Sequence, residues 1–386
     1  MRNIRLAEST FGSEEREAVL RVFDSGRLTM GPTCEAFEKA FAATVGARHA
    51  VFCNSGGSAN MLAALAVSAK YTDLRDAEVL VPATTWPTTV WPFVFAGATP
   101  VFVDCDPDTL QMDLGAAKRA ITRKTRAICL AHIMGNACDV EAAKALARAS
   151  DLVLIEDSCG AFGTKVDGRY VGTLGPVGTF SFFFSHHLST IEGGMLATQD
   201  HLVADIARSV RSHGWARPVA GLGDVASLYP DIEPRFLFLY PGFNFKPTEI
   251  QAAIGLVQLK KARLFDKVRA VAFARWTEAF SGRTDFRTIA PGPNVEPSWF
   301  GYAVVCRDTR TRDALRVHLE SHGIETRMVS GGNLARQPAF KGIGRAAGDL
   351  SGSDKIMTSG LFWGLHGMLT DEDIDYVVDV VARFAP

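Results

Sequence analysis

Two adjacent histidines, His186 and His187, follow an apolar stretch that contains Ser181, and a pair of glycines comes soon after them. A lone histidine is usually structural, but imidazole titrates near neutral pH and can accept or donate a proton during a reaction. Neighbouring side chains on an extended backbone point to opposite sides. We therefore expect one of these histidines, His186, to act as acid and base and the other to play a supporting role.

Three other segments end an apolar stretch with residues that can bind a ligand. CNSGGSAN, residues 53–60, brings Gly57 and Ser58 to the start of an expected helix, where N–H groups and a hydroxyl can hold an anion. A plain strand-to-helix turn has the same pattern. Asp157 in LIEDSCG can pair with a protonated ring nitrogen or simply cap a helix. Trp86 can stack on a planar group or pack in the core.

The elements around these residues predict how they are positioned. From about residue 13 to 210, amphipathic stretches alternate with short apolar runs, which predicts an α/β domain with a mostly parallel sheet flanked by helices. Ligands of such sheets bind beyond the carboxyl ends of the strands, where the candidate segments lie. We predict a large domain over residues 1–265 and a smaller C-terminal α+β domain over 266–386.

The composition argues against several classes of protein. The chain has 386 residues, of which 47% are hydrophobic and 22% charged, and its net charge of −1 gives no reason to expect nucleic-acid binding. No apolar stretch predicts a signal peptide or a membrane span, so we expect a cytoplasmic enzyme. The seven cysteines are scattered, which favours reduced thiols and argues against an iron–sulfur cluster; we expect no metal.

Taken together, these segments resemble the DegT/DnrJ/EryC1/StrS family of sugar aminotransferases. The likeness covers nearly the whole chain and includes GRLTMGPTCEAFEKAFA, VPATTW and GFNFKPTEIQAAIGLVQL besides the segments above. The resemblance implies the aspartate-aminotransferase-like fold, which is fold type I of the pyridoxal-phosphate enzymes. It also implies a cofactor, pyridoxal 5′-phosphate or its amine form, pyridoxamine 5′-phosphate.

The resemblance further implies a role for each residue of the cofactor site. Asp157 would pair with the pyridine nitrogen, and Trp86 would stack on the ring. Asn244 would reach the cofactor phosphate of a neighbouring subunit, which implies a homodimer with shared active sites. The phosphate within the same subunit would be held by three small residues: Gly57, Ser58 and Ser181.

One departure from the family suggests a different reaction. His186 stands where the family has the lysine that bonds covalently to the cofactor, and this replacement is typical of the keto-sugar 3-dehydratases within the family. Imidazole has no primary amine, so it can move protons but cannot form an imine. We therefore expect pyridoxamine phosphate to be held without a covalent bond while His186 acts as acid and base. A second departure is Gly160, where relatives carry a polar residue near the ring.

The expected reaction removes the C3 hydroxyl of a nucleotide-linked 4-keto-6-deoxy sugar. Overall likeness favours GDP-4-keto-6-deoxy-D-mannose as substrate, glutamate as amino donor, and a place in the synthesis of 3,6-dideoxysugars of the colitose type for surface polysaccharide such as lipopolysaccharide. The nucleotide and the stereochemistry of the sugar are not encoded in any motif. Four residues are candidates for sugar or nucleotide contacts, with packing roles equally plausible: His213, Trp215, Arg217 and Asn333.

Several alternatives stay open at this point. An ordinary nucleotide-sugar aminotransferase would need a lysine elsewhere, such as Lys246 or Lys165. A related dehydrase that uses an iron–sulfur centre also has histidine at this position, but the scattered cysteines argue against it. A non-catalytic sugar-binding homologue would not need to keep Asp157, Ser181 and Asn244.

Overall fold

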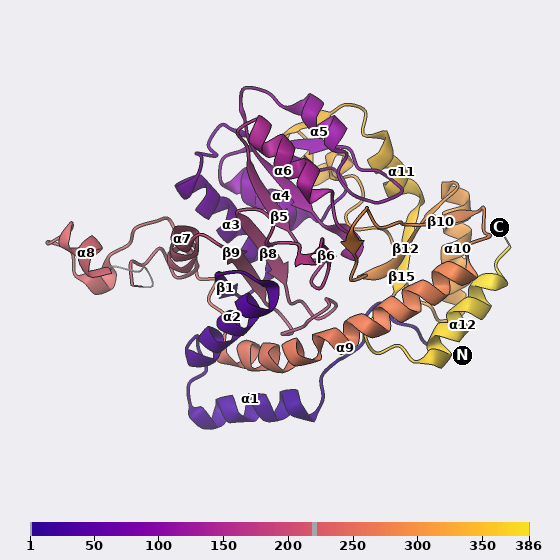
Figure 1. Cartoon of the computed structure of the whole chain (residues 1–386), viewed down its shortest axis with the longest axis horizontal. Helices are drawn as coiled ribbons and strands as arrows, with labels where there is room; N and C mark the ends of the chain where they lie inside the picture. Colours follow the sequence, from indigo (N-terminus) through magenta and orange to yellow (C-terminus); the bar gives the residue numbers. More distant parts are fainter. Residues whose placement is uncertain (1, 218–221, 386) are drawn as a thin grey trace.

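A computed structural model describes residues 2–217 and 222–385. Its centre is an eight-stranded sheet in which β9 runs antiparallel to both of its neighbours and the other adjacent strands are parallel, as the sequence predicts (Figure 1). The strands in their spatial order are β1 (His49–Cys53), β9 (Gly194–Thr198), β8 (Val177–Ser181), β5 (Val153–Asp157), β4 (Thr125–Ala131), β2 (Glu78–Pro82), β3 (Thr99–Val103) and β14 (Arg345–Ala347).

Both faces of this sheet are covered because its central strands are apolar on both sides. In β2, Val79 and Val81 pack with one group of helices, whereas Leu80 packs with the other group on the opposite face. The first group comprises α3 (Gly56–Lys70), α4 (Pro87–Phe95) and α7 (His201–Arg211). The second group comprises α5 (Leu114–Ala120) and α6 (Val140–Ala149).

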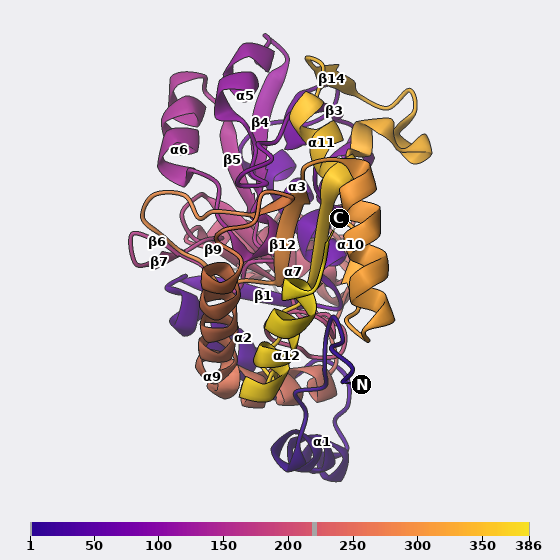
Figure 2. The same cartoon turned by 90° about the vertical axis from the view of Figure 1, so that its right-hand side faces the viewer.

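A long helix, α9 (Glu249–Ala279), connects the large sheet with a smaller one (Figures 1 and 2). It begins at a capping box in which Thr248 and Gln251 satisfy each other's backbone N–H groups. Its first half packs against α1 (Ser13–Ser25) and α2 (Pro32–Val45). The small antiparallel sheet has the strand order β10 (Phe286–Thr288), β12 (Gly301–Cys306), β15 (Gly360–Gly364) and β13 (Thr326–Arg327).

The remaining elements are helices around the small sheet and a third, three-stranded sheet. The helices are α10 (Thr309–Ser321), α11 (Ser351–Ser359) and α12 (Asp371–Ala382), with short 3₁₀ turns at 133–135, 234–236, 334–336 and 338–340. The third sheet has the strand order β11 (Val295–Glu296), β6 (Lys165–Val166) and β7 (Arg169–Tyr170). The division between residues 265 and 266 stays a prediction. Helix α9 continues across it, β14 joins the large sheet, and Ile4 pairs with Ile324 beside the small sheet.

The segment from α8 (Leu222–Ser227) to Phe238 projects from the large domain at the far left of Figure 1, and it is called the arm below. Apolar side chains along this arm are exposed, including Leu228, Phe236 and Phe238. Within residues 2–217 and 222–385, no helix combines the length and the hydropathy needed to cross a membrane.

Candidate active site

The first wall of the site is the start of helix α3, directly after strand β1. Ser55 caps this helix, because its Oγ accepts a hydrogen bond from the Ser58 backbone N–H at 3.1 Å. Gly56 lies so close to Ser181 that an added Cβ atom would be 2.5 Å from the Ser181 Cβ. The fold thus brings Gly57, Ser58 and Ser181 to one place, although their binding of a phosphate stays a prediction.

The second wall is the buried carboxylate of Asp157, where strand β5 ends. Its Oδ2 accepts hydrogen bonds from Asn60 Nδ2 at 2.9 Å and from Thr89 Oγ1 at 2.8 Å. Its Oδ1 accepts a third from the Cys159 backbone N–H at 3.0 Å. Because an ionised carboxylate can only accept hydrogen bonds, these three donors fix its orientation.

Sequence reasoning missed the two side chains that hold this carboxylate. Asn60 is fixed in turn by the Thr179 hydroxyl, and the Thr89 and Thr85 hydroxyls lie 2.9 Å apart. A signal for Asn60 was available, since it is a lone amide at the start of the apolar helical stretch MLAALAV. Thr89 carried no comparable signal, because a threonine in the first turn of a helix is ordinary.

His186 follows strand β8 in a turn, with its backbone N–H bonded to the Phe183 carbonyl at 2.9 Å. Its ring meets the Phe300 ring edge-on at a centroid distance of 5.3 Å, and its Nδ1 atom is buried without a hydrogen-bond partner. Burial lowers the pKa of His186 to about 4, although the Ser181 backbone and the Asp157 carboxylate favour protonation. The imidazole is therefore neutral at neutral pH and can accept a proton.

The two histidines do not lie on an extended backbone, because residues 184–188 form a turn and bends. His187 is buried, and its Nε2 lies 2.7 Å from the Ser298 carbonyl oxygen. His186, in contrast, has no hydrogen bond at Nδ1, and it lies close enough to the Ser181 backbone and the Asp157 carboxylate for both to affect its pKa. The structure therefore gives the pair two different environments.

Two predicted cofactor contacts lie at the rim of the site and are exposed in a single chain. Trp86, directly before helix α4, has 60% of its surface exposed, so the indole is accessible to a planar ligand. Asn244 is exposed too, and its backbone pairs with that of Ser212 at the base of the arm. Both side chains are therefore accessible from outside the chain, and their contacts with a cofactor stay predictions.

Three of the four candidate substrate contacts form a cluster at the base of the arm. Two cations lie near the Trp215 indole, with the Arg217 guanidinium 4.7 Å and the Lys246 ammonium 5.3 Å from its ring centroid. His213 Nε2 lies 3.4 Å from Lys246 Nζ. The Trp215 Nε1 atom is buried without a partner, so this cluster keeps an unused donor.

The fourth candidate, Asn333, lies apart from this cluster. It is fully buried, its Nδ2 donates to Asp354 at 2.7 Å, and its Oδ1 accepts from the Ala335 backbone N–H at 3.1 Å. These bonds give it a structural role, and a substrate contact stays a prediction. At Gly160, an added Cβ atom would have only the His132 carbonyl oxygen nearby, at 3.7 Å, so there is space beside the site.

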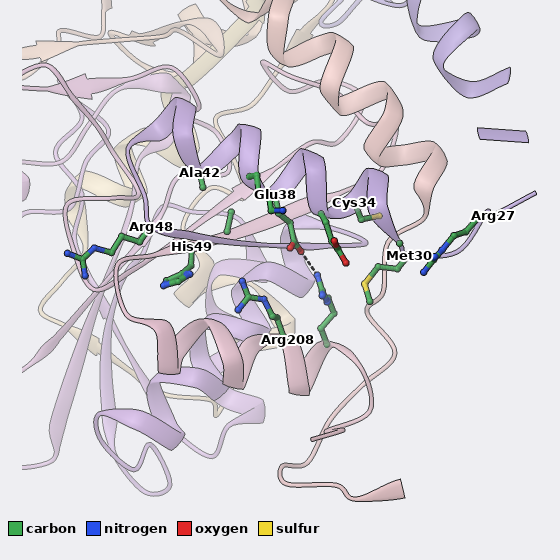
Figure 3. A pocket seen from close by; sticks show the side chains of 13 residues that line it. Arg27, Met30, Cys34, Glu38, Ala42, Arg48, His49 and Arg208 are labelled. Carbon is green, nitrogen blue, oxygen red and sulfur yellow. Dashed lines mark hydrogen bonds and ion pairs between the residues drawn. The ribbon is translucent and has the colours of Figure 1, made fainter. Parts of the chain in front are cut away.

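A separate hollow of about 570 Å³ lies between α2 and α7, beside the edge strand β1 (Figure 3). An ion pair between Glu38 and Arg211 spans it, with an N–O distance of 2.6 Å. The same two side chains bond to the backbone N–H and C=O of Phe52, and so cap the free edge of the sheet. None of the predicted site residues lines this hollow.

Comparison with known proteins agrees with this arrangement. The model of the DegT/DnrJ/EryC1/StrS aminotransferase family matches residues 9–382. The chain belongs to this family. The resemblance drawn from its motifs is therefore confirmed.

Among members of the DegT/DnrJ/EryC1/StrS family, the chain is similar to several dehydratases. It is 36% identical to the GDP-4-keto-6-deoxy-D-mannose 3-dehydratase of Yersinia pseudotuberculosis over 99% of both chains. It is 35% identical to the dTDP-4-dehydro-2,6-dideoxy-D-glucose 3-dehydratase of Saccharopolyspora spinosa, over 99% of this chain and 86% of that one.

A solved structure shares the fold over its whole length. The crystal structure of a GDP-4-keto-6-deoxymannose-3-dehydratase with a trapped PLP–glutamate geminal diamine superimposes with a TM-score of 0.91 at 31% identity. The match covers 98% of this chain and 100% of that one. The predicted α/β fold of fold type I is thereby confirmed.

Proposed function

We propose that this chain is a dehydratase that depends on pyridoxal or pyridoxamine phosphate and removes the C3 hydroxyl of a nucleotide-linked 4-keto-6-deoxy sugar. The observation that carries the proposal is the position of His186, beside Ser181 and within the field of the Asp157 carboxylate. Among the described residues, no lysine forms a hydrogen bond or ion pair with these three. The names of the similar proteins support the same reaction class.

The residues present fit the cofactor that this function requires. A cradle at the start of α3, too tight for a Cβ at Gly56, offers N–H groups and hydroxyls that suit a phosphate. The Asp157 carboxylate suits a protonated pyridine nitrogen, and the exposed Trp86 suits the flat face of a ring. When bound, the cofactor supplies an amine for the sugar ketone and a ring system that accepts electrons.

The chain's own side chains have separate tasks in this reaction. Asn60 and Thr89 keep the Asp157 carboxylate oriented, so that it would stay in place to pair with the pyridine nitrogen of a bound cofactor. His186 enters the reaction neutral, so it takes up one proton and then donates it to the C3 hydroxyl, which leaves as water. Since imidazole cannot form an imine, the amine nitrogen is released as ammonia and no amino sugar accumulates.

Glutamate closes the cycle as amino donor. Overall, the C3 oxygen of the sugar leaves as water and this carbon is reduced by two electrons. The glutamate Cα is oxidised by two electrons, loses ammonia and takes its keto oxygen from water, which gives 2-oxoglutarate. The similar structure that holds a PLP–glutamate adduct supports this donor. The first-named relative supports a GDP-linked sugar as substrate, whereas the second acts on a dTDP-linked one.

The functional unit in this proposal is a cytoplasmic homodimer with shared active sites. The exposure of Asn244 and of the apolar arm residues Leu228, Phe236 and Phe238 supports a second copy at this face. The seven cysteines are all free, and six of them are buried, which suits a reducing compartment. The reaction would serve the synthesis of 3,6-dideoxysugars for surface polysaccharide.

The deciding experiment incubates the pure protein with pyridoxal phosphate, glutamate and GDP-4-keto-6-deoxymannose. Mass spectrometry follows the sugar while ammonia is measured in parallel. A nitrogen-free 3-deoxy ketone with an equal amount of ammonia is the expected result. A nitrogen-containing sugar would instead establish an aminotransferase. If the GDP sugar does not react, a dTDP-linked substrate tests the nucleotide separately from the chemistry.

A further inference from the structure

The second histidine of the pair, His187, has a defined bonding state. It is only 5% exposed, and its Nε2 lies 2.7 Å from the Ser298 carbonyl oxygen. Because a carbonyl oxygen can only accept, Nε2 carries the proton and donates it. The Nδ1 atom is buried without a partner, and burial holds the pKa of His187 well below its ordinary value. His187 is therefore a neutral donor.

The carbonyl that accepts this bond is itself anchored to the large sheet. The Ser298 backbone N–H donates to Thr164 Oγ1 at 3.0 Å, and the Thr164 hydroxyl donates to the Gly135 carbonyl at 2.7 Å. The Phe300 backbone N–H donates to the Met134 carbonyl at 3.0 Å. These partners lie in loops after strands β4 and β5, and β5 ends in Asp157. His187 is thus tied to the same edge of the sheet that carries the site.

The segment beyond Ser298 is fixed from its other side and touches both histidines. Arg269, which is 4% exposed, donates to the Trp299 carbonyl at 3.0 Å and to the Leu365 carbonyl. The Phe300 ring lies 5.3 Å from the His186 ring and 5.8 Å from the His187 ring, measured between centroids. The segment to which His187 donates its hydrogen bond, at Ser298, therefore also carries Phe300, the ring against which the His186 ring packs.

We infer that His187 is a positioning residue: its hydrogen bond to Ser298 holds the turn so that His186 stays against Phe300 and faces the cofactor site. This inference rests on the proposed function, in which His186 moves the proton. His187 does not touch the substrate in this scheme. It fixes the backbone of its neighbour, and a displacement of about 1 Å at a reacting group can reduce a rate by about a hundredfold.

The pKa of His186 can be used to measure this positioning. Three charged or titratable groups face it: Asp157, Arg269 and His187 itself. Burial is the largest cause of its low pKa. If the turn is released, the His186 ring gains contact with water, and its pKa should rise from about 4 toward the ordinary value of 6.5.

The test compares three variants. H187F keeps a ring of similar size and removes the donor, and H187Q restores an N–H at nearly the same reach. H318F is the matched control, because His318 Nε2 bonds the Val380 carbonyl at 2.8 Å between α10 and α12. Histidine labelled with ¹³C at Cε1 allows NMR titration of His186 in the protein without added cofactor, with H186N used to assign the signal. Turnover is then measured with cofactor, glutamate and sugar.

The expected pattern is specific to positioning. H187F should raise the pKa of His186 by at least one unit and lower kcat at least about tenfold, with KM within about twofold, while H187Q recovers most of both. H318F should change neither. An unchanged His186 pKa and an unchanged kcat in folded H187F would overturn the inference. If H187F does not fold, wild-type values in H187L, which also lacks a donor, would overturn it as well. Inactive wild-type protein would refute the proposed function alone, because the NMR titration is independent of turnover.

Discussion

Two parts of the candidate site differ in how they are built. The floor is the buried Asp157 carboxylate with its hydrogen-bond donors, and the rim consists of Trp86 and Asn244. At the floor, both Asp157 carboxylate oxygens are satisfied by Asn60, Thr89 and the Cys159 backbone, all from one chain. At the rim, Trp86 and Asn244 are exposed. The floor is therefore complete within one chain, whereas the exposed rim has room for contacts with a ligand or another subunit. Mutations at the floor should therefore affect the monomer, and mutations at the rim should affect the assembly.

The largest loss of activity is expected from a substitution of His186. Replacement by asparagine keeps a polar side chain but removes the imidazole nitrogen that accepts and donates the proton. Turnover should fall by about 10²- to 10⁴-fold, the usual contribution of a general acid–base residue. Titration of pyridoxal phosphate, followed by absorbance, should give wild-type affinity. Unchanged turnover would contradict the assignment of His186 as acid and base.

The next largest effect is expected from a substitution of Asp157, which tests whether its hydrogen bonds and its charge both matter. D157N turns one acceptor oxygen into an NH₂ group that faces donors, and leaving a buried polar group unpaired costs about 1–3 kcal/mol of stability. It also removes the charge that would pair with the pyridine nitrogen, so affinity for the cofactor should fall at least about tenfold.

A matched variant separates the geometry of the floor from its charge. T89V removes one of the three donors to Asp157 and leaves the carboxylate in place. It should weaken cofactor binding less than D157N does, and it should cost about 1 kcal/mol of stability in urea unfolding. If T89V and D157N weakened binding equally, orientation and not charge would be the contribution of the floor.

The same contrast explains what the sequence could predict. The positions of Asp157, Ser181 and His186 at one edge of the sheet were predictable, because each lies at or just after the end of an apolar strand and parallel strands bring their carboxyl ends together. Their roles stay predictions. Thr89 was not predictable, because its partner is 68 residues away in the chain and threonine is common at helix starts. Nor was the return of β14 to the large sheet, since a three-residue strand leaves no period to detect.

The prediction for Asn244, at the rim, involves two subunits. N244A alone should reduce activity, because Asn244 is expected to reach the site of the other subunit. When H186N and N244A subunits are co-expressed with different tags, each mixed dimer should contain one site with both native residues. Random pairing would then restore about a quarter of wild-type activity. In the mixed dimer purified through both tags, one of the two sites is native, so its expected activity is about half of the wild-type value. Absence of recovery would place Asn244 outside the partner's site.

The smallest effect is expected for Glu249, and it is a loss of stability. Glu249, at the start of α9, caps helix α2 by accepting hydrogen bonds from the backbone N–H groups of Gly31, Thr33 and Cys34 at 2.8 to 2.9 Å. Burial alone would raise the pKa of Glu249, but these N–H groups outweigh it and lower the pKa below 4.5. We expect E249Q to lose about 1–2 kcal/mol of stability at pH 7.

The pH dependence of that loss distinguishes a charge effect from a packing effect. A carboxylate with a lowered folded-state pKa contributes its full stability above the unfolded-state pKa and loses it as the pH falls through the folded-state value. The difference between wild type and E249Q should therefore be constant from pH 7 to about 5 and shrink below 4.5. Urea unfolding at several pH values measures it, with E141Q on the surface of α6 as the control. A difference that is undiminished at pH 3 would mean that Glu249 acts through its shape, and that the charge of this cap does not stabilise the start of α2.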